Sequence, residues 1–167
     1  MSELEAVQGD ITRQTTDAIV NAANTSLAAG GGVCGAIHRA AGPDLARACG
    51  ALGGCPTGSA KITPGFNLGA RYVIHAVGPV WQGGTANEAE LLASCYRAAL
   101  TIAGDYRLRS LAFPCISTGI YGYPIAQAAE IAIRTVRAEI SHLPGIELVR
   151  FVCFNEADLA VYRKLVA

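Results

Sequence analysis

The stretch NAANTSLAAGGGVCGAIHRAAGP at residues 21–43 combines two asparagines, a cluster of glycines and a run with helical character. Glycines directly before a helix let backbone N–H groups approach an anion closely, and the first turn of the helix adds partial positive charge. The stretch therefore predicts a loop that binds a phosphate or diphosphate. The simpler alternative is a tight turn without a ligand, which an isolated glycine-rich loop fits equally well.

A second loop of the same kind, STGIYGYP at residues 117–124, follows the apolar segment 111–114 and leads into a helix expected from Pro124. Two strand–loop–helix units at the carboxyl edge of one sheet could hold the two sides of a diphosphate. Tyr121 offers an aromatic face to a sugar, although taken alone it would more often be an ordinary loop residue.

The glycines at positions 30, 32 and 35 also satisfy the GxGxxG spacing of dinucleotide-binding proteins. In those proteins the glycines lie in the turn directly after the first strand, and an acidic residue ~20 positions later binds the ribose. Here the loop lies well past the expected strand, and residues 50–56 contain no acid. A dinucleotide-dependent oxidoreductase is therefore disfavoured.

The bulk composition fits one globular domain, because 51% of the 167 residues are hydrophobic. Its 13 basic and 13 acidic residues balance, so no overall positive field favours nucleic acid or an anionic membrane. The chain begins without a secretory signal and has no apolar run near the ~20 residues of a membrane span, so we expect a cytoplasmic protein. The six cysteines include no C-x-x-C pair, which favours free, mostly buried thiols.

Short apolar segments alternate with longer segments of helical period, which predicts an α/β domain with one central sheet. The expected strands cover residues 4–8, 18–21, 72–77, 110–114 and 148–154. The expected helices cover residues 87–103, a segment from Pro124 to Pro144, and a last segment capped by Asn155.

The helix at residues 87–103 is the most clearly marked. Asn87 and Glu90 have the spacing of a capping box. Its apolar residues at helical spacing are expected to pack on the sheet, and they are Leu91, Cys95, Ala98 and Ile102.

Several polar or aromatic residues have a structural interpretation beside a functional one. Asp10, in the string GDIT at residues 9–12, could cap a turn or accept a hydrogen bond from an amino-substituted base, and the turn is favoured. His75 and Trp81 are expected to pack in the core or at its edge rather than to take part in chemistry. His38 follows the glycine loop and could face either solvent or neighbouring structure.

Together these motifs resemble the macrodomain family, and within it the MacroD-like branch, over essentially the full chain. The strings that carry the resemblance occur in the family's order: GDIT at 9–12, DAIVNAAN at 17–24, residues 30–42, CPTG at 55–58, YVIHAVGP at 72–79 and STGIYGYP at 117–124. The resemblance implies one domain over residues 1–167, a three-layer α/β/α sandwich with a central mixed sheet. It also implies ADP-ribose, its derivatives and ADP-ribosylated proteins as partners, with no metal or cofactor.

The resemblance assigns a role to each part of the ligand site. Asp10 would accept a hydrogen bond from the adenine amino group, Ile11 would donate from its backbone nearby, and Phe154 would pack on the adenine. Asn24 would hydrogen-bond the distal ribose, which Tyr121 would cover. Backbone donors to the diphosphate would come from the two loops, namely Gly31, Gly32, Val33, Cys34 and Gly35 in the first and Ser117, Thr118, Gly119, Ile120 and Tyr121 in the second.

The implied activity is hydrolysis of ADP-ribose esters at the C1'' carbon of the distal ribose, for example on mono-ADP-ribosylated acidic side chains or in O-acetyl-ADP-ribose. The catalytic candidates are Asn24, Gly32 and Cys34. Asn24 would orient the ribose, while the loop around Gly32 holds water and phosphate in register. Cys34 stands where MacroD-like proteins usually carry an aspartate credited with helping to activate water. This departure favours a second hypothesis, a non-enzymatic reader of ADP-ribose on proteins.

Cys34 has three interpretations. It can be an inert small residue, a binding-site thiol without chemical duty, or a thiolate activated by the helix N-terminus. The third needs a basic partner, and the sequence leaves open whether His38 faces the thiol. Viral macrodomains resemble this chain in carrying a non-acidic residue at this position while still being hydrolases, which implies that the substrate's phosphate can position or activate water.

Overall fold

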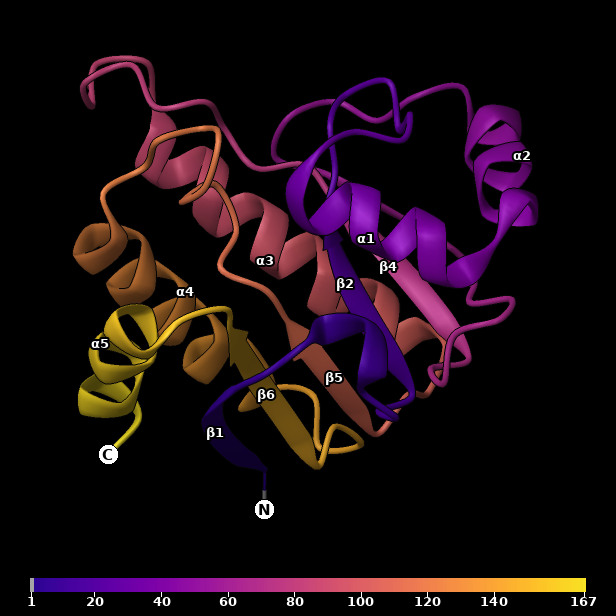
Figure 1. Cartoon of the computed structure of the whole chain (residues 1–167). Helices are drawn as coiled ribbons and strands as arrows, with labels where there is room; N and C mark the ends of the chain where they lie inside the picture. The colour runs from indigo at the N-terminus through magenta and orange to yellow at the C-terminus, as the bar shows by residue number, and fades with distance from the viewer. Residues whose placement is uncertain (1) are drawn as a thin grey trace.

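The computed structural model describes residues 2–167 and places a six-stranded sheet between two layers of helices (Figure 1). The strands are β1 (Glu3–Gln8), β2 (Ala18–Ala22), β3 (Ala60–Pro64), β4 (Tyr72–Ala76), β5 (Ser110–Phe113) and β6 (Leu148–Cys153). They lie in the order β1-β6-β5-β2-β4-β3, and only β3 runs antiparallel to its neighbour. The carboxyl ends of the parallel strands therefore meet at one edge of the sheet, where ligands of such folds bind.

The helices are α1 (Gly32–Ala41), α2 (Pro43–Leu52), α3 (Glu88–Asp105), α4 (Ile125–Ile140) and α5 (Glu156–Val166), with a short 3-10 turn at Ile11–Arg13. Helices α1 and α2 cover one face of the sheet, and α3, α4 and α5 cover the other (Figure 1). Among residues 2–167, no helix has both the length and the apolar character needed to cross a membrane.

Burial on both faces explains why the central strands read as continuous apolar runs. Successive strand residues point to opposite faces, so Ile19 of β2 packs in the cluster with α1 and α2, whereas Val20 packs in the cluster with α3 and α4. Both side chains are fully buried. Such burial stabilises the fold by roughly 1.5–3 kcal/mol for each Val or Ile side chain. The predicted three-layer α/β/α architecture with a mixed sheet is confirmed.

Two elements were not predicted from the sequence, β3 and α2. Strand β3 is an edge strand whose residues are mostly only partly buried, so its sequence has no clear alternation of apolar and polar positions. Helix α2 begins at Pro43. From the sequence, this proline suggested only where the preceding helix ends. Proline fits the first turn of a helix because the N–H it lacks has no intrahelical acceptor there.

The predicted capping box at the start of α3 is wrong. Asn87 has a left-handed backbone with φ of +62°, and its side chain makes no capping hydrogen bond. The carboxylate of Glu88 instead accepts backbone hydrogen bonds from Gln82, Gly84 and Ala86 at 2.6–2.8 Å. Burial alone would raise the pKa of Glu88, but these N–H donors outweigh it and lower the pKa to about 2.

The predicted apolar stripe of α3 is displaced by one position. Only Cys95 of the predicted set is fully buried, whereas Leu91, Ala98 and Ile102 are partly exposed. The residues of α3 that face the core are Leu92, Ala93, Cys95, Tyr96, Ala99, Leu100 and Ala103. The helical residues Ala129, Ala132 and Val136 of α4 and Leu159 and Tyr162 of α5 pack in the same cluster. The predicted cap of α5 is confirmed, because Asn155 accepts from the N–H of Asp158.

Candidate ligand-binding site

The first glycine loop ends in the N-terminus of α1. Gly31 is the residue before the helix, and Gly32 has φ of +56°, a conformation that favours glycine. A Cβ atom on Gly35 would lie 2.4 Å from the carbonyl oxygen of Gly30, so the loop can fold back on the helix only if this residue is glycine. The first N–H groups of a helix have no intrahelical acceptor, which leaves those of this turn available to an anion.

Asn24 closes the turn that leads into this loop. Its Oδ1 accepts hydrogen bonds from the Ser26 hydroxyl at 2.7 Å and the Ala28 N–H at 3.2 Å, and its Nδ2 donates to the Ala28 carbonyl at 3.0 Å. The same Nδ2 lies 3.6 Å from where a Cβ atom on Gly30 would stand, so the amide borders the glycine loop. The structure gives Asn24 a structural role in the turn, and its contact with a ribose stays a prediction.

The second loop follows β5 and is anchored by the segment after β4. Trp81 donates its backbone N–H to the carbonyl of Tyr121 at 2.8 Å, and its ring packs against Tyr123 with centroids 4.6 Å apart. Packing by Trp81 is therefore confirmed. Ser117, the first residue of the loop, has φ of +68° and a buried hydroxyl without a hydrogen-bond partner among residues 2–167.

The remaining residues of the second loop differ in their surroundings. The hydroxyl of Thr118 donates to the carbonyl of Cys115 at 3.0 Å and is turned toward the strand. The carbonyl of Gly119 accepts from the N–H of Gly122 at 3.0 Å, which makes a tight turn. Tyr121 is partly exposed, and Ile120 is exposed to 84%. An aliphatic side chain this exposed is available to cover a ligand.

The two loops lie side by side at the carboxyl edge of the sheet (Figure 1). A Cβ atom on Gly31 would lie 3.6 Å from Cδ1 of Ile120, which is ordinary van der Waals contact. The start of α1 and the loop after β5 are separated by more than eighty residues in the sequence. The structure thus brings together the two segments predicted to hold a diphosphate.

Asp10 caps the short 3-10 turn after β1. Its Oδ1 accepts hydrogen bonds from the hydroxyl of Thr12 at 2.6 Å and the N–H of Thr12 at 2.9 Å, and these bonds lower the pKa of Asp10. Its second oxygen lies 3.9 Å from Nε of Arg13. The turn-capping interpretation is confirmed. Within residues 2–167 the other carboxylate oxygen accepts no hydrogen bond, so it could accept one from an adenine amino group.

The residues predicted to bind adenine lie at neighbouring strand ends. The N–H of Gly9 donates to the carbonyl of Cys153 at 3.0 Å, which holds the segment before Asp10 beside the segment before Phe154. Ile11 is buried in the core under α1, so only its backbone can serve a ligand. Phe154 is exposed to 85%, an unusual state for a large aromatic side chain and one that suits a stacking partner.

A line of buried polar groups runs beneath the first loop. Nδ2 of Asn21 lies 3.7 Å from the sulfur of Cys34 and 3.0 Å from Nδ1 of His75. Nε2 of His75 lies 2.9 Å from the hydroxyl of Thr63. Because Asn21 donates to Nδ1, we assign the proton of the neutral ring to Nε2, which donates to Thr63. Burial, and secondarily His38, lower the pKa of His75 to about 4.

Cys34 is buried, and its thiol donates to the carbonyl of Ala28 at 3.5 Å. His38 is buried one turn further along α1, and burial lowers its pKa. Nε2 of His38 has no hydrogen-bond partner in the described part of the chain, the Cys34 thiol included. A thiolate nucleophile needs a basic partner, so this arrangement disfavours the activated-thiolate interpretation.

Sequence reasoning missed two residues that shape the site, Asn21 and Gly78. Asn21 and His75 are both polar residues in apolar strands, and the pairing of β2 with β4 places them opposite each other. A Cβ atom on Gly78 would lie 2.3 Å from the Ser117 hydroxyl oxygen, so this glycine makes room for the second loop. The polar positions in the strands were a usable signal for Asn21, but the contact of Gly78 required the fold.

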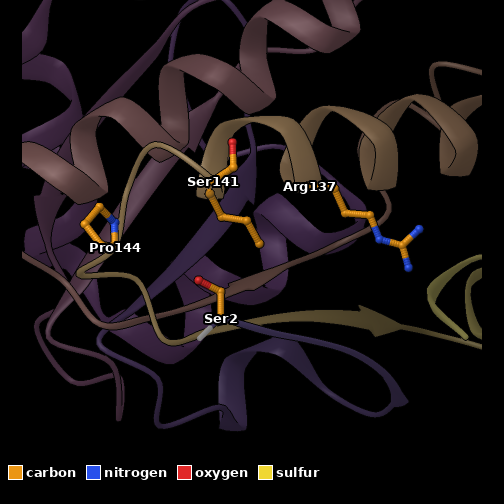
Figure 2. Close-up of a pocket in the computed structure, with 5 residues that line it drawn as sticks. Ser2, Arg137, Ser141 and Pro144 are labelled. Carbon is orange, nitrogen blue, oxygen red and sulfur yellow. The ribbon is translucent and has the colours of Figure 1, made fainter.

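Two surface pockets lie away from the loops. Figure 2 shows one of about 350 Å³ lined by Ser2, Arg137, Ile140, Ser141 and Pro144, at the edge of the sheet where β1 begins. The other, of about 520 Å³, lies between β1 and α5 and is lined by Val7, Gln8, Glu156, Leu159, Ala160 and Arg163. Neither contains a residue of the glycine loops.

Comparison with known proteins establishes the family. The Macro domain model matches residues 20–132, which include the whole first loop and the whole second loop. The chain belongs to the Macro domain family. A Macro domain-containing protein of Chlorobaculum tepidum, CT2219, is 62% identical over 164 residues, covering 98% of this chain and 95% of the relative. A protein of Salmonella gallinarum named O-acetyl-ADP-ribose deacetylase is 55% identical, covering 98% and 94%.

Solved Macro domain structures share the same fold. The Trypanosoma brucei macrodomain in complex with ADP-ribose has a TM-score of 0.93 and 43% identity, covering 98% of this chain and 69% of that chain. The Oceanobacillus iheyensis macrodomain with ADP has a TM-score of 0.91 and 48% identity, covering 95% and 87%. The α/β/α Macro domain fold expected from the sequence is confirmed.

Proposed function

We propose that this Macro domain binds ADP-ribose across its two glycine loops and hydrolyses ADP-ribose esters. The closeness of Gly31 and Ile120 carries the proposal, because a Cβ atom on Gly31 would lie 3.6 Å from Cδ1 of Ile120 and the two loops with their backbone N–H groups are therefore neighbours. Asp10 and Phe154 extend that site along the same sheet edge toward an adenine. The ADP-ribose complex of a 43% identical macrodomain and the deacetylase name of a 55% identical relative support both parts.

The chemistry we propose for the site is orientation and charge stabilisation. N–H groups of the first turn of α1, including that of Gly32, bind the diphosphate, and the loop holds a water near the ester on the distal ribose. Attack by that water breaks the ester bond and yields ADP-ribose and a carboxylate. Asn24 keeps the ribose oriented while its turn keeps the glycine loop in shape. Mono-ADP-ribosylated acidic side chains and O-acetyl-ADP-ribose are the proposed substrates.

A release assay tests this proposal. The protein is incubated with O-acetyl-ADP-ribose and with a protein mono-ADP-ribosylated on acidic side chains, and free ADP-ribose is measured beside a calorimetric titration with ADP-ribose. We expect binding and turnover. Binding without release would instead support a non-enzymatic reader, which the replacement of the usual aspartate by Cys34 favours.

Variants at the Asn24 turn separate its two roles. Asn24→Ala should lower turnover more than affinity, because orientation matters most in the reacting complex. Ser26→Ala is the matched control, since it loosens the same turn but leaves the amide in place. Equal losses of turnover in the two variants would show that the turn alone matters.

A further inference from the structure

Two cysteines at neighbouring strand ends form a thiol pair. The thiol of Cys115 donates a hydrogen bond to the sulfur of Cys153 at 3.8 Å. Strands β5 and β6 are parallel neighbours with Phe113 opposite Phe151, and Cys115 and Cys153 each follow that pair by two residues. Neighbouring strands lie ~4.8 Å apart. That spacing falls within the ~4.4–6.8 Å between Cα atoms that a disulfide spans.

The other cysteines have different partners. Among residues 2–167, the thiols of Cys34, Cys55 and Cys95 donate to backbone carbonyls, and Cys49 lies 3.6 Å from the ring nitrogen of His75. Cys115 and Cys153 are therefore the one direct thiol–thiol contact in the described chain.

The two sulfurs differ in access and acidity. Cys115 is partly exposed, while Cys153 is fully buried. The hydrogen bond from Cys115 lowers the pKa of Cys153, and that same bond, together with burial, raises the pKa of Cys115. The pair thus consists of a thiol on a partly exposed residue and a more acidic thiol on a buried residue. A thiolate is the form that attacks an oxidised sulfur.

A tyrosine hydroxyl lies beside the pair. The hydroxyl of Tyr162 is buried and has no hydrogen-bond partner within residues 2–167. Burial raises the pKa of Tyr162, and the nearby groups of Tyr96 and Cys115 raise it further, so it remains a neutral donor. This hydroxyl lies close enough to Cys115 to affect the pKa of that thiol, and it can donate to an oxygen added to the sulfur.

The pair connects to both halves of the ligand site. Cys115 lies two residues before Ser117, and its carbonyl accepts the hydrogen bond from Thr118 of the second loop. Cys153 directly precedes Phe154, and its carbonyl accepts the N–H of Gly9 beside Asp10. A disulfide between the two sulfurs, now 3.8 Å apart, would tie the first residues of both segments together in one geometry.

We propose that Cys115 and Cys153 form a reversible disulfide with peroxides, and that this bond weakens ligand binding at the neighbouring loops. The sulfur of one cysteine attacks one oxygen of hydrogen peroxide, the O–O bond breaks, and a sulfenic acid and one water form. The sulfur of the other cysteine then attacks the oxidised sulfur, the S–S bond forms, and the sulfenic oxygen leaves as a second water with the proton of the attacking thiol. A thiol reductant restores both thiols. The effect on binding rests on the proposed function, while the disulfide itself does not.

Peptide mapping of the whole native chain after hydrogen peroxide treatment tests the disulfide. Trypsin places Cys115 alone in the peptide 110–134 and Cys153 alone in 151–163, so the bond joins two peptides that each contain one cysteine. We expect this cross-linked peptide, lost after reduction and absent from Cys115→Ser. Cys55→Ser is the matched control and should retain it. A wild-type digest without this peptide, or with these cysteines joined to others, overturns the proposal.

The effect on binding is measured by calorimetry on oxidised and reduced protein. We expect ADP-ribose affinity to fall several-fold on oxidation and to recover with reductant, with no change in oxidised Cys115→Ser. Unchanged affinity in fully cross-linked protein overturns the link to the ligand site. Failure of the reduced protein to bind ADP-ribose contradicts the proposed function instead, and the peptide map remains decisive for the disulfide.

Discussion

The side-chain nitrogen of Asn21 lies 3.0 Å from Nδ1 of His75 and reaches the sulfur of Cys34 on its other side at 3.7 Å. Cys34 is thus held by hydrogen bonds beneath the glycine loop. Among the described residues no basic side chain makes a hydrogen bond to its thiol. His75 is neutral at pH 7, because burial lowers its pKa to about 4. This arrangement favours a structural thiol over a catalytic one.

Replacing the Cys34 thiol should therefore change the rate of ester hydrolysis little. Cys34→Ala removes a small buried side chain whose hydrogen bonds are long, and we expect it to retain most of the ester hydrolysis of the wild type. Steady-state release of ADP-ribose measures this. Near-complete inactivation in a variant that still binds ADP-ribose would show that the sulfur takes part in the reaction.

Cys34→Asp tests the opposite case. The third residue of α1 is a favourable place for a carboxylate, because the first turn of a helix carries partial positive charge and Asn21 can donate to it. If a carboxylate helps activate water, turnover should rise, and general-base assistance is worth typically about 10²–10⁴-fold. A rate equal to that of Cys34→Ala would show that water is positioned without such help.

Gly35 should be required for the shape of the first loop. In Gly35→Ala the new Cβ atom would lie 2.4 Å from the Gly30 carbonyl oxygen, so backbone must move. We expect at least about tenfold weaker ADP-ribose binding, equivalent to ~1.4 kcal/mol. Gly50→Ala is the matched control, because nothing lies within 4 Å of its Cβ position in α2. Wild-type affinity in Gly35→Ala would contradict the proposed loop geometry.

Asp10 has a confirmed role in its turn and a predicted role at the adenine. Asp10→Ala should weaken ADP-ribose binding by ~1–3 kcal/mol, the range for a hydrogen bond to a charged group and the group left unpaired. Thr12→Val controls for the turn, since it removes one donor to Asp10 but keeps the carboxylate. Calorimetry distinguishes them, and an unchanged dissociation constant in folded Asp10→Ala would limit Asp10 to the turn.

His75 should make the fold sensitive to mild acid. Its pKa falls from 6.5 in a model peptide to about 4 in the folded protein, so the unfolded chain binds the proton first as pH decreases. Its contribution to the free energy of unfolding is complete above pH 6.5 and is lost toward pH 4, up to about 3 kcal/mol. His38 acts in the same direction.

Urea unfolding at pH 7 and pH 5 measures this loss. In this range Glu88 stays ionised, because its pKa is about 2. We expect the free energy of unfolding to decrease less between pH 7 and pH 5 in His75→Gln, because glutamine binds no proton at this position. An identical decrease in both proteins would assign the acid sensitivity to other groups.

The sequence predicted the parts of the fold whose patterns allow one interpretation. The central strands are apolar on both faces, and the two glycine loops precede helices. These strands, loops and helices could therefore be located from the sequence. Helix α3 was harder, because apolar residues occupy both of two adjacent faces, at Leu91 and Leu92 and again at Ala98 and Ala99. Periodicity could not choose between these faces. The choice depends on the packing of α3 against the sheet and α4.

The site was predictable where one segment acts alone and less so where two segments meet. The position of the first loop, directly before α1, follows from the sequence of that segment alone. The contact of Asn21 with His75, and that of Cys115 with Cys153, depend on which strands pair and in which register. Those pairings join residues far apart in the chain, and no local pattern encodes them.

The central claim, one ligand held by both loops, is tested most directly by comparing ADP-ribose with AMP in calorimetric titrations of the same protein. AMP can reach the adenine side near Asp10 and Phe154, but only ADP-ribose carries the diphosphate and the distal ribose that the two loops would hold. The account predicts that ADP-ribose binds much more tightly than AMP. Equal affinities for the two ligands would contradict it.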